Sequence, residues 1–380
     1  MSLHLSTQID LPLIVYAILG ILTFVQLYYI LFVYGKLAFY KVRSYQHNTV
    51  FSPVSVIICA HNEQDNLIKF LPTILQQEYP DFEVVVVNDC STDDSKWILQ
   101  DMTRAYKHLK IVDIKEHIQL KHSKKFALTL GIKAASYEKL ILTDADCQPQ
   151  SNTWLKEMSG AFENGRELIL DYSPYFKATS FLNKFIRFET THTAMSYLSY
   201  ALKRNTYMGV GRNLAYNKTL FFQGKGFNAH MHIKSGDDDL FVNTNATTSN
   251  VNIAIHPDAH VYSVAKDSWK SYYKQKARHV SASTLYKTKH KRMLGTQLAS
   301  SALFYLMLIL CIFLYPSLWY LALSAYLLRL IGQLAVFNAI YKKLAVKDLL
   351  IWLPLLDIFY YFYICTNGLF NRHKKQPSWK

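Results

Sequence analysis

The chain has 380 residues, of which 51% are apolar, and its 42 lysines and arginines outnumber 27 acidic residues to give a net charge of +15. This apolar fraction excludes an intrinsically disordered protein, and only 13 glycines and 10 prolines exclude a collagen-like or low-complexity chain. Five scattered cysteines exclude a disulfide-rich secreted module. Membranes and nucleic acids both remain candidate partners for a basic, apolar chain.

Residues 11–34 form the first predicted membrane segment. They carry no charge and are longer than the roughly 20 residues that cross a bilayer core. The alternative is a cleaved signal peptide, but the run is too long for one and residues 1–10 before it hold no lysine or arginine. Because Lys36, Lys41 and Arg43 follow directly, the positive-inside rule predicts an anchor with the next domain in the cytoplasm.

The apolar composition of residues 298–370 predicts a second membrane region. Two spans, 298–315 and 318–340, are separated by Pro316, and lysines 342, 343 and 347 follow the second. A third apolar segment, 349–370, precedes a basic tail at 371–380. A full third span would place this tail outside, against the positive-inside rule, so we expect either a third span or a re-entrant or interfacial segment.

Arg329 and Asp357 are ionisable residues inside these C-terminal segments. Charged side chains are costly in lipid and usually face protein or water. We interpret them as a pair that joins two helices. The alternative is that Arg329 contacts an anionic lipid headgroup.

Residues 50–295 have the composition of a soluble domain. Short β-branched runs, typical of buried strands, lie at 54–60, 83–87, 110–114 and 139–143. Helices are expected between them, one capped by Asn62 and another capped within residues 91–94. The alternation predicts an α/β fold with a doubly wound, mostly parallel sheet.

Acidic residues follow the ends of these predicted strands, where parallel sheets bind ligands. Asp144 and Asp146 stand two residues apart, so extended backbone would place both carboxylates on one face. Such a pair suits Mg²⁺ or Mn²⁺ on a diphosphate, although two aspartates in a loop are more often turn or capping residues. Asn62 and Asp89 fall at the same edge.

A second acidic cluster is formed by Asp237, Asp238 and Asp239. Three consecutive carboxylates repel one another, so one of them is expected to have a raised pKa or a cationic partner. That property suits a general base. The alternative is an exposed acidic turn at the start of a helix.

Residues 266–292 form a basic stretch directly before a predicted span. Nine lysines and arginines face one acidic residue, which predicts an interfacial helix region against anionic headgroups. Within it, Gln275 and Arg278 stand one helical turn apart and suit a phosphate or a sugar. Because the charge gathers beside a span, we expect membrane contact and no nucleic acid partner.

In their order along the chain, these motifs resemble the membrane-bound, inverting family 2 glycosyltransferases with a GT-A fold. The resemblance covers about residues 50–295, and one N-terminal and several C-terminal membrane segments are usual in this family. The matching segments are Ala60-His-Asn-Glu63, Val87-Asn-Asp89, Lys124-Lys-Phe-Ala-Leu128, Asp144-Ala-Asp146, Gly236-Asp-Asp-Asp-Leu240 and Gln275-x-x-Arg278-His279.

The resemblance implies a nucleotide-sugar site. Asn62, Glu63 and Asp89 would hold the base and ribose of a nucleotide, typically UDP, and Lys124 would line the same site. Asp144 and Asp146 match the DxD motif, in which the second aspartate binds the divalent metal, Mg²⁺ or Mn²⁺, on the diphosphate.

The resemblance also implies that one carboxylate of 237–239 is the base that deprotonates the acceptor. Anchoring the motif on Leu240 favours Asp237 and anchoring it on Gly236 favours Asp238, and we select Asp238, with Asp237 and Asp239 as further candidates. Gln275 and Arg278 match an element that closes over the pyrophosphate.

The same element carries His279 where tryptophan is usual, which weakens a polymer-forming interpretation. His279, with Arg212 and Asn213 of a loop that resembles the acceptor side of the family, is a candidate acceptor contact. The resemblance therefore implies an inverting, metal-dependent transfer from a UDP-sugar to a lipid or lipid-linked glycan acceptor. Two alternatives remain open: a processive polysaccharide synthase, and a non-catalytic, membrane-anchored nucleotide-binding protein.

Overall fold

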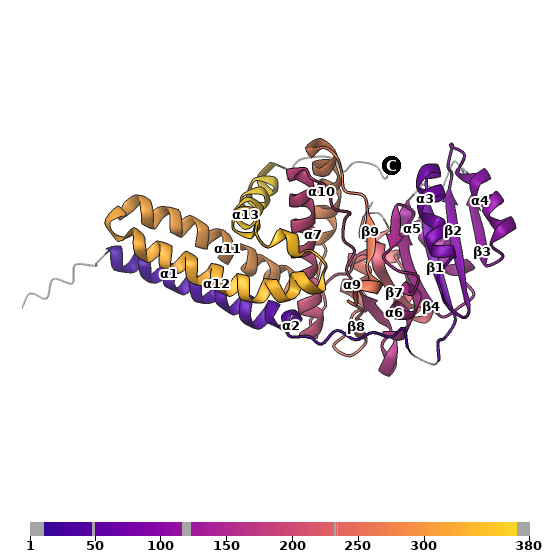
Figure 1. The fold of residues 1–380 in the computed structure, drawn as a ribbon, viewed down its shortest axis with the longest axis horizontal. Helices are drawn as coiled ribbons and strands as arrows, with labels where there is room; N and C mark the ends of the chain where they lie inside the picture. Colours follow the sequence, from indigo (N-terminus) through magenta and orange to yellow (C-terminus); the bar gives the residue numbers. More distant parts are fainter. Residues whose placement is uncertain (1–10, 48–49, 116–122, 232, 234, 371–380) are drawn as a thin grey trace, which may run out of the picture.

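The computed structural model describes residues 11–47, 50–115, 123–231, 233 and 235–370. An α/β domain stands at one end of a bundle of long helices, and the helices α7, α10 and α13 lie between the two parts (Figure 1). The predicted N-terminal segment 1–10 and basic tail 371–380 lie outside the described residues.

The central sheet has seven strands in the order β3-β2-β1-β4-β7-β6-β8. Strands β1 to β4 are mutually parallel, while β7 runs antiparallel to both β4 and β6. A smaller sheet pairs β5 with β9. The predicted doubly wound, mostly parallel fold is therefore confirmed. The strands are Val54–Ala60 (β1), Phe82–Asp89 (β2), Leu109–Ile114 (β3), Lys139–Asp144 (β4), Cys147–Pro149 (β5), Leu168–Leu170 (β6), Leu214–Asn217 (β7), Val251–Ile253 (β8) and Val261–Ser263 (β9).

Short helices complete the α/β domain, and longer ones form the bundle. Those of the domain are Gln64–Leu75 (α3), Ser95–Ala105 (α4), Lys124–Ala134 (α5), Trp154–Gly160 (α6), Lys218–Gln223 (α8) and Asp239–Asn245 (α9). The others are Leu11–Tyr28 (α1), Gly35–Ala38 (α2), Phe181–Leu202 (α7), Trp269–Ser283 (α10), Thr288–Leu314 (α11), Trp319–Lys343 (α12) and Leu353–Phe370 (α13).

Asn62 does not cap the helix that follows β1, contrary to expectation. Its backbone takes a left-handed conformation with φ of 55°, which asparagine tolerates better than most residues. Its side-chain oxygen accepts a hydrogen bond from the Thr92 backbone N–H at 2.8 Å. The first N–H of α3, on Gln64, is instead satisfied by Asp93 at 3.1 Å. The loops after β1 and β2 are thus tied to each other.

Three helical segments are long and apolar enough to cross a membrane among the residues that the structure describes: Leu11–Ala38, Thr288–Leu314 and Pro316–Lys343. The corresponding helices α1, α11 and α12 run side by side (Figure 1). α11 begins at Thr288, ten residues before the predicted span, because a hydropathy pattern reports only the apolar part of a helix. The end of the basic stretch 266–292 therefore forms the first turn of α11.

The last apolar segment, α13, differs from the other three. Its described apolar part, Leu353–Thr366, is shorter, and it packs against α7, where the rings of Phe359 and Phe185 are 4.9 Å apart. Whether α13 crosses a membrane or lies at its surface stays a prediction.

Arg329 and Asp357 form a buried ion pair, which confirms the interpretation of two helices joined by opposite charges. Nη1 of Arg329 lies 2.7 Å from Oδ2 of Asp357, and both side chains are almost fully buried. Gln26 of α1 and Gln333 of α12 add hydrogen bonds at 3.3 and 3.0 Å to the guanidinium. The pair therefore connects α1, α12 and α13.

We expect Arg329→Ala to prevent folded protein from accumulating, because removing one partner of a buried pair costs about 3–5 kcal/mol. Exchanging the charges, Arg329→Asp with Asp357→Arg, should recover part of the wild-type amount of monodisperse protein in size-exclusion chromatography. Arg104→Ala is the matched control, since Arg104 pairs with Asp101 on the exposed surface. An exchanged pair that accumulates no better than the single variants would contradict the prediction.

Candidate active site

The candidate site is built from loops at the carboxyl ends of β1, β2 and β4. Asn62 and Glu63 follow β1, buried Asp89 ends β2, and Asp144 ends β4. The parallel register places Cys59 opposite both Val87 and Asp144, so these strand ends meet at one edge. These four of the predicted nucleotide residues therefore lie at one edge of the sheet.

Lys124 connects the first acidic motif to the second. It is the first residue of α5, whose N-terminus is capped by the Ser123 side chain. Its Nζ lies 2.7 Å from Oδ1 of Asp144 and 3.2 Å from Oδ2 of Asp237. Burial alone would lower the pKa of Lys124, but the two carboxylates raise it well above its usual value. Lys124 is thus a fixed cation between two loops 93 positions apart in sequence, at 144 and 237.

The acidic triplet begins with a turn that requires glycine. Gly236 has φ of +88°, and a Cβ at this position would lie 2.5 Å from Leu240. The turn presents Asp237 to Lys124. Burial raises the pKa of Asp237, but the charge of Lys124, hydrogen bonds to its carboxylate and the charge of Lys125 together lower it below its usual value. Asp237 is therefore an ionised partner of Lys124.

Asp238 has a different environment. Its Oδ2 accepts a hydrogen bond from the Gly211 N–H at 2.7 Å, and its Oδ1 accepts one from the Asp239 N–H at 2.7 Å. Burial and the neighbouring charge of Asp237 raise the pKa of Asp238. A carboxylate that is oriented by backbone donors and has a raised pKa has the properties of a general base.

Asp239 is directed to another part of the fold. Its Oδ2 accepts a hydrogen bond from the Tyr286 hydroxyl at 2.8 Å, and its Oδ1 accepts one from the Leu240 N–H. Its side chain is buried and is not among those that line the cavity beside Lys124. This environment favours a structural role for Asp239 at the start of α9 over the role of a base.

The pKa of Asp239 leads to a prediction of how the stability of the protein depends on pH. Burial, followed by the charge of Asp238, raises its pKa to about 7, above the unfolded value of about 3.9. The folded state thus retains a proton that the unfolded state releases, so this group makes the protein less stable as the pH rises from about 4 to about 7. Asp239→Asn should remove much of this loss and raise the Tm at pH 8, by about 2–4 °C for each kcal/mol recovered.

The difference in Tm between Asp239→Asn and the wild type should be smaller at pH 5 than at pH 8. Differential scanning fluorimetry at both pH values measures it. Asp101→Asn, on the exposed surface, serves as the control and should follow the wild type at each pH. An advantage of the same size at both pH values would contradict the raised pKa.

A small cavity lies where these groups meet. It is lined by Ile57, Cys59, Lys124, Leu128, Leu142, Thr143, Asp144, Gly211, Asp237 and Asp238. The buried hydroxyl of Thr143 has no hydrogen-bond partner among the described residues. A polar group that points into a cavity without a partner can bind a ligand oxygen.

Arg212 and Asn213, the candidate acceptor residues, occupy different environments. The guanidinium of Arg212 stacks on the ring of Tyr175 at 4.3 Å and donates to the Ser173 carbonyl. Asn213 is fully buried, and its amide nitrogen donates hydrogen bonds to Asp171, Tyr172 and Ala259, so in this structure its side chain holds the loop.

Gln275 and Arg278 lie one turn apart on α10, partly exposed. The Arg278 carbonyl accepts a hydrogen bond from Ser235 at 3.0 Å, so α10 lies directly beside the turn that presents the acidic triplet. His279 belongs to α10 by its backbone, and its side chain lies outside the described residues.

Gly211 and Tyr286 are site residues that sequence reasoning missed. A Cβ at Gly211 would lie 3.3 Å from Cβ of Asp238. Tyr286 stands 47 positions from Asp239, and no local pattern indicates such a contact.

A divalent metal fits Asp144 and Asp146 only as part of a larger ligand set. Asp146 is partly exposed beyond the end of β4. Among the described residues, no three His, Cys, Asp or Glu side chains gather as a metal site. Mg²⁺ is commonly held by one or two carboxylates together with substrate phosphates and waters, so two aspartates at this edge suit a metal that arrives with a diphosphate.

The sheet order is that of the GT-A fold. Residues 55–223 match the model of glycosyl transferase family 2, and this part of the chain is a family 2 glycosyltransferase domain. A solved mannosyltransferase from Pyrobaculum calidifontis, in complex with GDP-Man and Mn²⁺, has a similar fold. The likeness covers 92% of this chain and 99% of that one, with a TM-score of 0.55 and 17% identity.

Two curated relatives match a shorter segment. A poly-β-1,6-N-acetyl-D-glucosamine synthase from Staphylococcus epidermidis is 33% identical over 93 residues, which are 24% of this chain and 21% of that protein. A β-monoglucosyldiacylglycerol synthase from Nostoc is 30% identical over 104 residues, which are 27% of this chain and 22% of that protein. The chain thus spans about a fifth of the length of either relative.

Proposed function

We propose that this glycosyltransferase transfers a sugar from a nucleotide-diphosphate sugar, a UDP-sugar in the first place, to a lipid or lipid-linked acceptor with inversion. The observation that carries the proposal is the position of Lys124, which contacts both Asp144 and Asp237. A single cation thereby brings the proposed diphosphate site and the proposed base into one cavity. The GDP-Man and Mn²⁺ bound to the mannosyltransferase support a nucleotide sugar and a divalent metal.

The donor would lie along the carboxyl edge of the sheet. Asn62, Glu63 and Asp89 would hold the base and ribose. Lys124 and Arg278 would neutralise the diphosphate, and Gln275 would bind beside it. A bound Mg²⁺ or Mn²⁺, held by Asp146 and Asp144, would supply further positive charge for the leaving group.

Asp238 would act on the acceptor. Its carboxylate takes the proton of the acceptor hydroxyl, whose oxygen forms a bond to the anomeric carbon. The bond from that carbon to the diphosphate oxygen breaks, and the diphosphate leaves with the electron pair. A single displacement of this kind inverts the anomeric centre and needs no protein nucleophile.

The proposed topology places the α/β domain in the cytoplasm of an integral membrane protein. Helices α1, α11 and α12 would cross the membrane, with lysines 342, 343 and 347 on the cytoplasmic side. If α13 then lies at the membrane surface, the basic tail stays on that side too. The glucolipid synthase relative is consistent with an acceptor that is reached from the membrane.

The test is an assay of the purified full-length protein in lipid nanodiscs with UDP- and GDP-sugars, Mn²⁺ and a lipid extract. Release of nucleoside diphosphate together with a glycosylated lipid is expected. Binding of a nucleotide sugar without turnover would favour the non-catalytic alternative.

A processive polysaccharide synthase is the second candidate, favoured by the match to a poly-N-acetylglucosamine synthase. Product length separates the two functions, since transfer of one sugar per acceptor excludes polymerisation.

A further inference from the structure

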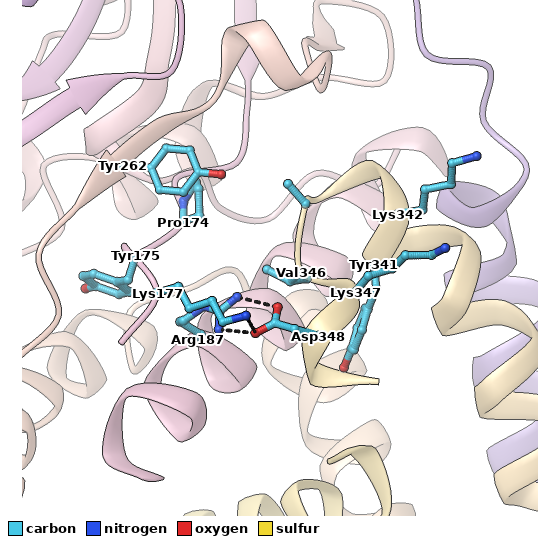
Figure 2. A pocket seen from close by; sticks show the side chains of 11 residues that line it. Pro174, Tyr175, Lys177, Arg187, Tyr262, Tyr341, Lys342, Val346, Lys347 and Asp348 are labelled. Atoms are coloured by element: carbon cyan, nitrogen blue, oxygen red, sulfur yellow. Dashed lines mark hydrogen bonds and ion pairs between the residues drawn. The ribbon is translucent and has the colours of Figure 1, made fainter. Parts of the chain in front are cut away.

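A second cavity lies at the junction of the α/β domain and the bundle. It has a volume of about 430 Å³, within the range of small-molecule sites. Its walls come from the loop after β6, from α7, from β9 and from the turn between α12 and α13 (Figure 2). It shares no lining residue with the cavity beside Lys124.

The cavity is strongly basic. Lys177, Arg187, Lys342 and Lys347 line it against a single acidic residue, Asp348. Arg187 binds both oxygens of Asp348, at 2.8 and 2.7 Å, and Lys177 lies 3.3 Å from the same carboxylate. One carboxylate therefore faces four cations, and an anion would balance the excess.

Two lysines of the lining remain for that anion. Lys342 and Lys347 are exposed, and in Figure 2 they extend away from the Arg187–Asp348 pair. Arg187 is 4% exposed, and its Nε has no hydrogen-bond partner among the described residues. A buried guanidinium N–H without a partner is costly unless a ligand satisfies it.

The backbone on the α12 side is fixed. Ala345 follows the end of α12 with φ of 54°, and the Val346 N–H returns to the Tyr341 carbonyl at 2.9 Å. This is the geometry of a Schellman turn. The turn holds Lys347 and Asp348 in place at the end of a helix that is apolar enough to cross a membrane.

Apolar groups continue from this turn. Ile351 and Trp352 follow it, and their side chains are 84% and 37% exposed. Exposed apolar and tryptophan side chains next to lysines are typical of the boundary between a membrane and water. The cavity would therefore receive a phosphate from the membrane side, with hydrocarbon beside it.

A short series of contacts connects the cavity to the proposed base. Tyr175 lines it and stacks on Arg212 at 4.3 Å. The residue before Arg212, Gly211, donates its N–H to Asp238. One stacked pair thus separates the cavity from the loop that orients the base.

We propose that this basic cavity binds the phosphate group of a membrane lipid and that this lipid is the acceptor. The inference rests on the proposed function and narrows its acceptor to a phosphate-bearing lipid. Lys342 and Lys347 bind the phosphate at the rim of the cavity, Arg187 adds positive charge in its wall, and the hydrocarbon chain lies along Ile351 and Trp352.

The test compares a double variant, which carries both Lys342→Gln and Lys347→Gln, with the wild-type full-length protein in an uncharged detergent. The matched control is Lys107→Gln with Lys133→Gln, two exposed lysines of the α/β domain. Dihexanoyl phosphatidic acid, dihexanoyl phosphatidylcholine and inorganic phosphate are titrated while the Tm is followed.

Phosphatidic acid should raise the Tm of wild type and control, and its apparent affinity should fall at least tenfold in the double variant. Phosphatidylcholine and inorganic phosphate should have little effect. An equal response of the double variant would overturn the proposal. An equal response of the wild type to inorganic phosphate would mean that the cavity binds a free anion, and it would overturn the proposal that a lipid is bound there.

Donor hydrolysis without lipid, measured as nucleoside diphosphate release, separates the two proposals. If the wild type hydrolyses donor but does not respond to phosphatidic acid, the acceptor inference fails alone. If it responds to phosphatidic acid but releases no nucleoside diphosphate from any nucleotide sugar, the proposed function fails, and with it the acceptor role of the lipid.

Discussion

Replacing Asp238 with asparagine is expected to lower kcat for sugar transfer about 10²–10⁴-fold, the usual contribution of a general acid–base group. The amide cannot take a proton from the acceptor, but it keeps the size of the side chain and an oxygen for the Gly211 N–H. The KM for the donor should change little, because Asp238 is proposed to act on the acceptor. Release of nucleoside diphosphate and formation of glycosylated lipid measure both parameters.

Asp239→Asn provides the comparison that makes this result specific. Asp239 faces Tyr286, so its replacement should leave kcat within a few-fold of the wild-type value at the same pH. Wild-type transfer by Asp238→Asn together with loss of transfer in Asp239→Asn would move the base to Asp239 and contradict the assignment.

Replacing Asp146 with asparagine is expected to lower transfer at least about 10²-fold, since removing one group that stabilises transition-state charge typically costs 10²–10³-fold. A neutral amide is a weaker ligand for a hard divalent cation than a carboxylate. The activity remaining should therefore no longer rise with Mn²⁺ concentration. Transfer is measured over a series of Mn²⁺ concentrations, with wild-type protein in EDTA as the metal-free reference.

Asp101→Asn, far from the sheet edge in sequence and exposed, is the control and should keep the Mn²⁺ response of the wild type. Asp144→Asn should differ from both, because it also removes the 2.7 Å ion pair with Lys124 and should lower the Tm. Wild-type turnover in EDTA, or by Asp146→Asn at every Mn²⁺ concentration, would contradict the metal assignment.

The sheet could be predicted from the sequence because its central strands are buried on both faces. β1 is formed by residues 54–60, as the β-branched run predicts, and β2 and β3 begin one residue earlier than predicted. A continuous, β-branched apolar run between turn residues is typical of a strand that is buried on both faces. The position of Asn62 could not be predicted in the same way, since a capping residue and a left-handed residue look alike in sequence.

The acidic triplet shows where sequence reasoning ends. Asp237, Asp238 and Asp239 are chemically identical, and their roles differ only through Lys124, Gly211 and Tyr286. These partners come from other loops and helices, so no spacing rule within the triplet can assign the base. The fold decides which carboxylate is paired, which is oriented by backbone donors and which is buried.

The basic cavity was not predictable for a similar reason. Arg187 and Asp348 are 161 positions apart, in segments that sequence analysis assigned to different domains. In the sequence, the lysines at and after the end of α12 indicate only the topology of the chain. That Lys342 and Lys347 line one cavity with Arg187 of α7 follows only from the fold.

The most direct measurement is a structure of the full-length protein with Mn²⁺ and the nucleoside diphosphate of its donor. The diphosphate should lie beyond the end of β4, with the anomalous signal of Mn²⁺ at Asp146 and with Lys124 within hydrogen-bond distance of a phosphate oxygen. A nucleoside diphosphate bound away from this edge, for example in the basic cavity beside Arg187, would contradict the assignment of the active site.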